Sequence, residues 1–274
     1  MNPSTLAAPS TGITNFMQRV TSLAKFGTAM IAVLFTTTLQ AAEPRAPLIV
    51  GVENQYYLPA YAYENGQYKG FARDLLDAFA RDKGYQIEYR ALPVQRLYAS
   101  LFSGQVDFKF PDNPNWQGEK RTGKAVVYSE PVIAFVDGVS VKPERKTAQA
   151  DEIRVLGTVS GFTPWSWGDR LKSGKATLAE NASLDALVRQ TIAGRIDGAY
   201  ASVAVINYQL DHVLKQPGAL VFHSGLPFSR DHYFLSSIKR PEVIREFSQW
   251  MKQNRSMIAA LKKQHGVEKG VGPD

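Results

Sequence analysis

Apolar positions in the first third of the chain change spacing between the periods of strands and helices. Residues 47–53 are a short apolar run rich in β-branched side chains, which indicates a buried strand. Large apolar residues then recur at helical spacing until Gly84, which is placed to end a helix. The pattern predicts, in chain order, a strand, helix, strand, helix and strand at residues 47–53, 71–80, 86–92, 94–103 and 106–110. This order implies a parallel sheet with helices on its faces.

The same order of elements returns in the second half of the chain. It predicts strands and helices in alternation at residues 152–159, 163–174, 175–180, 183–194 and 195–201. One local pattern occurs in both halves: a helix, Gly104 or Gly194, any residue, a β-branched residue, then Asp107 or Asp197 and a strand. Glycine supplies the left-handed end of the helix and aspartate orders the turn, so we expect both aspartates to be structural. Two similar α/β lobes are the natural inference.

The remaining segments fit connections between the lobes and a helical end. Residues 130–147 are rich in β-formers before becoming polar, and residues 219–238 form a second such segment, so both are expected to cross between the lobes. Helices are predicted at residues 241–253 and 256–264. The last ten or so residues are poor in apolar side chains and are expected to be frayed.

The N-terminal segment has the pattern of a secretory signal. An uncharged apolar run at residues 26–39 follows Arg19 and Lys25, and small residues suited to signal peptidase come next. The run is short for a membrane span, which needs about 20 residues. We expect residues 1–42 to be a signal peptide cleaved near Ala41 or Ala42, with Met1 and Met17 both open as the start. A retained N-terminal anchor is the alternative.

Charge and cysteine content narrow the function classes. The net charge of the 274-residue chain is +7, and it falls to +5 without residues 1–42 because two basic residues leave. This mild excess is spread along the chain, which gives weak support to an anionic ligand and argues against nucleic-acid binding. The chain has no cysteine, which excludes disulfides, thiol chemistry and a lipid-modified cysteine. Together with the signal sequence, the lack of cysteine predicts a periplasmic protein of a Gram-negative bacterium.

Common catalytic and metal-binding motifs are missing from the sequence. Residues 118–125 approach a phosphate-binding loop, but Ala125 stands where a Ser or Thr must bind Mg²⁺ and a strand-like segment follows. The four histidines are scattered and form no helical pair, so no metal site is predicted. There is no G-x-S-x-G elbow for a serine hydrolase. We predict no cofactor and no catalytic residues.

Two features suggest a small-molecule pocket. Residues 160–165, "SGFTPW", predict a helix N-terminus whose free N–H groups could hold an anion, although Thr163 as a simple cap would give the same letters. Aromatic residues also gather where loops should line a cleft between lobes. They are Tyr56, Tyr57, Tyr61, Tyr63, Trp116, Trp165 and Trp167. For each of them burial in the core is the alternative.

Lys109 interrupts the third strand, between Phe108 and Phe110. Strand alternation sends the two phenylalanines to one face and Lys109 to the other, which should also be dry in a sheet covered on both faces. In one interpretation its stem packs and its ammonium reaches water. In the other, Lys109 and Asp112 form a charged pair at the cleft floor.

Four segments together carry a family resemblance. They are the aromatic loop, "YKGF" and acidic helix of residues 56–89, "LFSGQVDF" at 101–108, "YSEP" at 128–131 and "IAGRIDGAYAS" at 192–202. In order and spacing they resemble the extracellular solute-binding proteins of family three, which include polar amino-acid receptors of ABC importers. The resemblance covers about residues 48–266. It implies a two-lobed type II periplasmic-binding-protein fold, in which each lobe is a mostly parallel sheet flanked by helices and two strands form the hinge.

The resemblance also implies roles in the first lobe. Tyr56 or Tyr57 stands where the family places an aromatic residue against the ligand. Arg121 stands nearest to the family's carboxylate-binding arginine, with Lys120 as competitor. The threonine that precedes this arginine in the family is missing here. The distance along the chain from Arg121 to "YSEP" is also one residue longer than in the family.

In the second lobe, Ser202 stands where amino-acid receptors often carry an aspartate for the ligand's ammonium group. A hydroxyl cannot replace that charge. Either Asp112 supplies it, or the ligand is not an ordinary α-amino acid. The predicted ligand-binding residues are Tyr56, Tyr57, Lys109, Asp112, Trp116, Arg121, Ser160, Gly161, Thr163 and Ser202.

These inferences combine into one prediction. The chain is expected to be a monomeric periplasmic solute-binding protein that closes on a small polar ligand, an amino acid or related charged metabolite, for an ABC-type permease. Residues 43–138 and 228–274 would form lobe 1 and residues 139–227 lobe 2. Two alternatives stay open: an enzyme resembling cyclohexadienyl dehydratases, with Asp112 as the only cleft acid in view, and a sensor without transport.

Overall fold

Residues 46–272 are described here from a computed structural model of the chain. The predicted signal peptide lies outside these residues. The first predicted unit is present: strands β1 (Leu48–Glu53), β5 (Ile87–Leu92) and β6 (Phe108–Asp112) form a parallel sheet with β1 in the middle. Helices α1 (Phe71–Lys83) and α2 (Val94–Phe102) connect them. A small antiparallel sheet, β2 (Tyr56–Tyr57), β3 (Tyr61–Glu64) and β4 (Gln67–Lys69), replaces the loop expected after β1.

The second unit repeats the arrangement. Strands β9 (Val155–Val159), β10 (Thr177–Asn181) and β11 (Gly198–Ser202) are parallel, with β9 in the middle and helix α5 (Leu184–Ile192) before β11. The long helix predicted at residues 163–174 is wrong. Pro164 has ψ 74°, outside the helical region, and only a 3₁₀ turn (Trp165–Trp167) and a short helix α4 (Gly168–Lys172) form. Helix α6 (Val203–Tyr208) and the π-helical turn Gln209–Leu214 were not expected.

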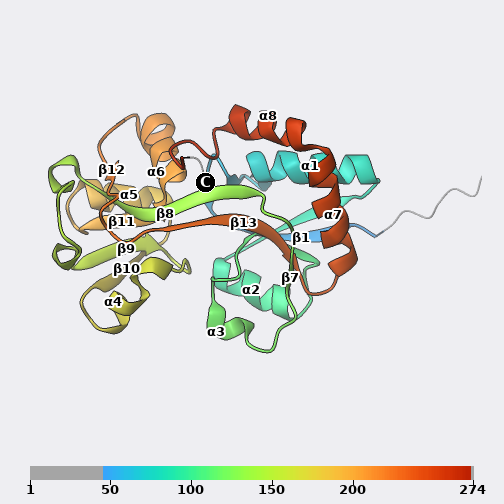
Figure 1. Ribbon diagram of the computed structural model, residues 1–274, viewed down its shortest axis with the longest axis horizontal. Helices are drawn as coiled ribbons and strands as arrows, with labels where there is room; N and C mark the ends of the chain where they lie inside the picture. Colours follow the sequence, from blue (N-terminus) through green and yellow to red (C-terminus); the bar gives the residue numbers. More distant parts are fainter. Residues whose placement is uncertain (1–45, 273–274) are drawn as a thin grey trace, which may run out of the picture. The chain divides into compact units, whose positions relative to one another are not determined.

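Two long strands join the units into one sheet. In β8 (Ile133–Val141) and β13 (Ser229–Ser237), residues 133–137 pair antiparallel with residues 229–233. Beyond this shared part, β8 pairs with β11 and β13 pairs with β6, which gives the strand order β10-β9-β11-β8-β13-β6-β1-β5. Figure 1 shows β8 and β13 running side by side between the two groups of strands. They are the two crossing segments that the sequence predicted, whereas the lobe bounds stay a prediction.

Short elements and the C-terminal helices complete the chain. The elements are α3 (Gly118–Arg121), β7 (Val127–Tyr128), β12 (Val221–Phe222), α7 (Pro241–Gln253), α8 (Arg255–His265) and 3₁₀ turns at Pro143–Arg145 and Ala150–Glu152. Helix α7 buries Phe247, whose ring meets Phe79 of α1 at a centroid distance of 5.1 Å. No helix within residues 46–272 has the length and apolar character to cross a membrane.

The repeated Gly and Asp pattern has the predicted structural role. Gly104 and Gly194 have φ 72° and 69°, which a side chain would disfavour. The Asp107 carboxylate accepts a hydrogen bond from Ile49 N at 2.9 Å, and Asp197 accepts from Arg154 N and Val155 N at 2.9 and 2.8 Å. Each aspartate therefore fastens the strand it precedes to a neighbouring strand.

The expectation of a frayed C-terminus is wrong for the described part. Val267 and Val271 are buried, and Val271 packs in one cluster with Ala134 and Val136 of β8. The Glu268 carboxylate accepts a hydrogen bond from Ala134 N at 2.9 Å. The segment after α8 therefore adds contacts to the first half of the crossing strand β8.

Candidate functional site

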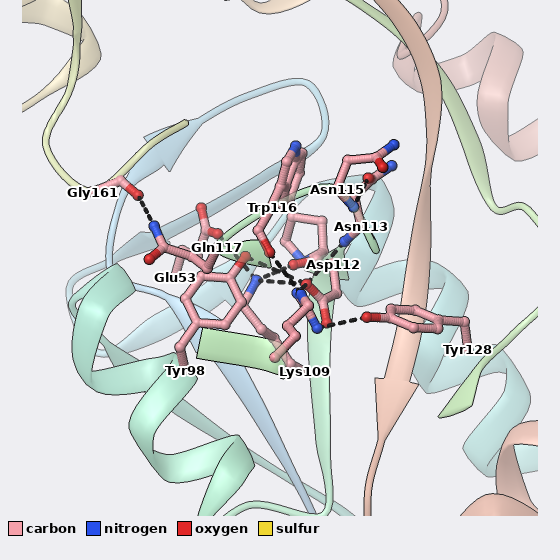
Figure 2. Close-up of polar contacts among 12 residues, drawn as sticks. Glu53, Tyr98, Lys109, Asp112, Asn113, Asn115, Trp116, Gln117, Tyr128 and Gly161 are labelled. Carbon is pink, nitrogen blue, oxygen red and sulfur yellow. Dashed lines mark hydrogen bonds and ion pairs between the residues drawn. The ribbon is translucent and has the colours of Figure 1, made fainter. Parts of the chain in front are cut away.

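A buried ion cluster lies where β1 and β6 run side by side. The register pairs Gly51 with Lys109, so Glu53 lies slightly further along β1. The Lys109 side chain is fully buried, with Nζ 3.4 Å from Glu53 Oε1 and 3.9 Å from Asp112 Oδ1 (Figure 2). Nζ also donates to the Pro111 carbonyl and lies 4.6 Å from the centre of the Tyr98 ring. The ammonium does not reach water. The pair with Asp112 exists, but Glu53 is the nearer carboxylate and sequence reasoning missed it.

Arg121 is held by the same cluster. From α3 its Nη2 donates to Asp112 Oδ1 at 2.5 Å, its Nε to Trp116 O at 2.6 Å and its Nη1 to the Tyr128 hydroxyl at 2.6 Å. Lys120, the competing cation, donates to the side chain of Gln95. A buried, charge-assisted pair of this kind is strong, so the guanidinium of Arg121 is occupied within the protein.

A partly open cavity of about 30 Å³ lies beside this cluster. Its aromatic walls are Tyr57, Tyr61, Tyr98, Trp116, Tyr200 and Tyr233, together with Phe162 from the loop after β9. The first four come from the β1 to α3 part of the chain and Tyr200 from β11, while Tyr233 belongs to the crossing strand β13. Both units and the strands that join them therefore contribute to one cavity.

Two carboxylates line this cavity. Glu53 is 2% exposed and accepts a hydrogen bond from the Tyr61 hydroxyl. Asp137 projects from the crossing strand β8, and its buried Oδ1 has no hydrogen-bond partner in the described protein. Burial, Asp231 and Glu53 together raise the pKa of Asp137 from 3.8 to about 7. No Lys, Arg or His occurs among the described residues that line the cavity.

The predicted site residues divide into two groups. Those that line the cavity are Tyr57, Trp116, Gly161 and Thr163. Those that do not are Tyr56, Lys109, Asp112, Arg121, Ser160 and Ser202. Lys109 and Asp112 touch the walls through Tyr98, while the backbone N–H of Ser202 donates to the Tyr57 hydroxyl at 2.9 Å. The structure thus brings together only part of the set that the sequence suggested.

The loop of residues 160–163 differs from the predicted anion site. Gly161 N donates to the Glu180 carboxylate at 2.9 Å, and Ser160 N donates to Asn181 O at 2.8 Å. Ser160 is exposed, and no α-helix begins at Thr163. On the other side of the loop, Gln117 Nε2 donates to Gly161 O at 3.3 Å (Figure 2). A carboxylate of the chain itself therefore uses the amide that a ligand anion would need.

Glu53, Asp137, Tyr200 and Tyr233 were missed by sequence reasoning. Asp137 did give a signal, since it is a lone acid in the otherwise apolar stretch "VIAFVDGVSV". A charge within a buried strand requires either a partner or a function. Within residues 46–272, no group of three or more His, Cys, Asp or Glu side chains could hold a metal ion.

Comparison with known proteins decides the family. The sequence profile of the bacterial extracellular solute-binding proteins, family 3, matches residues 48–264. The chain belongs to this family. The predicted family resemblance is thereby confirmed, and the match spans both crossing strands and every residue that lines the cavity.

Individual relatives of this family 3 protein are distant. A probable histidine-binding protein of Neisseria gonorrhoeae is 23% identical over 183 residues, which are 65% of this chain and 66% of that protein, slightly under two thirds of its length. The arginine-, lysine-, histidine-binding protein ArtJ from Geobacillus stearothermophilus superposes with a TM-score of 0.66 at 18% identity, covering 80% of this chain and 95% of ArtJ.

Two further solved structures show the same fold. The ancestral amino acid-binding protein AncCDT-1, a precursor of cyclohexadienyl dehydratase, has a TM-score of 0.64 at 20% identity, covering 81% of this chain and 96% of its own. A histidine kinase sensor domain similar to periplasmic binding proteins has a TM-score of 0.67 at 18% identity, with coverages of 81% and 96%. These likenesses confirm the predicted fold class, an α/β fold of the two-lobed binding-protein type.

Proposed function

We propose that the protein captures a small polar solute, an amino acid or a related charged metabolite, and delivers it to an ABC-type permease from the periplasm. The observation that carries the proposal is the aromatic cavity to which both α/β units contribute. Membership of a solute-binding family and the name of the Neisseria relative support it. Action as a monomer, cleavage near Ala41 or Ala42 and the lobe bounds 43–138, 228–274 and 139–227 belong to the same proposal.

The proposed mechanism is closure of the two lobes around the ligand. A cavity of about 30 Å³ has room for about two water molecules, so a larger solute must enter an opened form. Contacts across the cavity include Ser202 N to the Tyr57 hydroxyl, Gln117 to Gly161 O, and the edge-to-face rings of Tyr57 and Phe162 at 5.3 Å. Such contacts can be broken and remade while β8 and β13 act as the hinge. A ligand that touches both lobes would favour the closed form.

Thermal unfolding of residues 43–274 tests this function. In a panel of amino acids, amines, polyamines, organic acids and oligopeptides, we expect at least one compound to raise the unfolding temperature. A compound at 100 times its dissociation constant should add about 2.7 kcal/mol to the free energy of unfolding. Disaccharides serve as the control for non-specific effects of solutes. If no compound shifts unfolding more than the disaccharides do, the proposed function is wrong.

An enzyme on the same fold is a second candidate, favoured by one observation. With a pKa of about 7, Asp137 is partly protonated near neutral pH, as a general acid requires. It also lies in the cavity, unlike Asp112, which the sequence had suggested for this role. The same panel followed by proton NMR separates the two functions, because an enzyme would convert a compound that a receptor only binds.

A further inference from the structure

We infer that the cavity selects an organic cation without a free carboxylate, and that Asp137 pairs with its positive charge. This inference deepens the proposed function and rests on it. Three observations carry it: the groups suited to a ligand carboxylate are occupied, the cavity has one carboxylate without a partner, and its walls are aromatic.

Two groups that were predicted to hold a ligand carboxylate are bound to carboxylates of the chain. The Arg121 guanidinium is bound to Asp112, whose side chain is fully buried. The Gly161 amide is bound to Glu180. Displacing Asp112 would leave a buried charge without its partner, at a cost that a ligand carboxylate would have to offset. Glu180 is exposed, so its displacement from Gly161 would cost less. Within the described residues, a zwitterionic amino acid therefore finds no positively charged group for its negative end among those that line the cavity.

The charges inside the cavity favour a cation. Glu53 is balanced by Lys109, whereas Asp137 has no cation near it in the described contacts and its Oδ1 makes no hydrogen bond. A buried carboxylate oxygen without a donor is costly, and an ammonium group supplies both the charge and the donor that are missing. The cavity is thus complementary to one positive charge. A carboxylate placed there would face two acids instead.

The aromatic walls complete this complementarity. Tyrosine and tryptophan faces attract cations within about 6 Å of the ring centre. The protein's own Lys109 already uses Tyr98 in this way from outside the cavity. Tyr57, Tyr200 and Tyr233 remain around Asp137 to surround the cationic end of a ligand. Primary amines, guanidines and small quaternary ammonium compounds all share this chemistry.

Calorimetric titration with matched pairs tests the inference on the unaltered protein. The pairs are agmatine and arginine, histamine and histidine, putrescine and ornithine, and tyramine and tyrosine, with choline added. Each amino acid amide serves as a control that keeps the ammonium and hides the carboxylate. For the pair that binds, we expect the amine and the amide to bind at least about tenfold more tightly than the zwitterion, because the zwitterion leaves a buried charge unpaired.

The same titration on two variants tests the role of Asp137. Asp137→Asn keeps the shape and removes the charge, so amine affinity should fall by at least about tenfold. Glu119→Gln is the matched control: it removes a negative charge from an exposed position on α3 and should change affinity less than about twofold. Equal loss in both variants would overturn the direct pairing with Asp137.

The outcomes separate this inference from the proposed function. Tight binding of a zwitterion with weaker binding of its amine would overturn the cation selectivity and leave the solute-binding function standing. A second outcome is that no member of the pairs binds and choline does not bind, while a carboxylic acid from the wider panel binds. The inference is then wrong and the solute-binding function still stands. If nothing binds, both fail.

Discussion

Lys109→Met is expected to lower the free energy of unfolding by about 3–5 kcal/mol, as removal of one partner from a buried ion pair does. Methionine keeps the volume of the side chain, so the loss arises from charge rather than from a cavity. Glu53, which is 2% exposed, would be left without its cation, and the Pro111 carbonyl would lose its donor. Urea unfolding monitored by tryptophan fluorescence measures the change through the transition midpoint.

Lys69→Met is the matched control for this experiment. Lys69 also pairs with a glutamate, at 3.1 Å, but both side chains are more than 40% exposed. Exposed pairs contribute at most about 1 kcal/mol, so the control should change stability little. If the two variants lose the same free energy of unfolding, the buried cluster at the edge of the cavity stabilises the fold no more than an exposed ion pair does.

In contrast to Lys109→Met, Asp137→Asn is expected to raise the free energy of unfolding of the ligand-free protein at pH 8. Burial, Asp231 and Glu53 raise the pKa of Asp137 from 3.8 to about 7, so its ionised form destabilises the fold. Each pKa unit corresponds to about 1.4 kcal/mol. Asparagine removes the charge but still buries a polar group, so we expect a gain of about 2 kcal/mol. A residue kept at such a cost is typical of a functional site.

The pH dependence of this gain provides its check. In the wild type, the stability associated with protonated Asp137 is fully present below pH 4 and is lost as pH rises to about 7. The free energy of unfolding of Asp137→Asn should therefore exceed that of the wild type by an amount that grows from pH 4 to about 7 and is constant above it. Other ionisable groups that influence Asp137 are Asp231, Glu53, Tyr57, Tyr200 and Tyr233. Glu119→Gln, without a buried charge, should show no such trend, and a difference independent of pH would contradict the account.

Local patterns were sufficient to predict most of the fold. Period and turn residues identified the parallel strands of both units and helices α1, α2 and α5. Gly104 and Gly194 follow α2 and α5 in the left-handed region, as expected for glycine. Strands β8 and β13 lie within the two segments, residues 130–147 and 219–238, that were predicted to cross between the lobes. The helix predicted at residues 163–174 was wrong because a cap residue and a helix-like composition do not reveal the backbone conformation of Pro164.

The site was harder to predict because it depends on which charges meet. Arg121 was assigned to a ligand carboxylate, but its pairing with Asp112 arises only when α3 folds beside the end of β6. Likewise, nothing in the sequence places Glu180 against Gly161. Asp137 was visible as an acid in an apolar strand, yet its lack of a partner is a tertiary property. Periodicity locates elements, whereas the balance of charges in a cavity requires their arrangement.

Native mass spectrometry of the protein, purified gently from the cells that produce it, tests the central claim most directly. If the lobes close around a captured solute as proposed, its release is slow and it should remain bound through purification. We expect a fraction of the protein to carry one additional small molecule, which Asp137→Asn loses and Glu119→Gln retains. A protein without any bound small molecule, which also binds none of the compounds offered to it, would contradict the claim that this chain is a solute receptor.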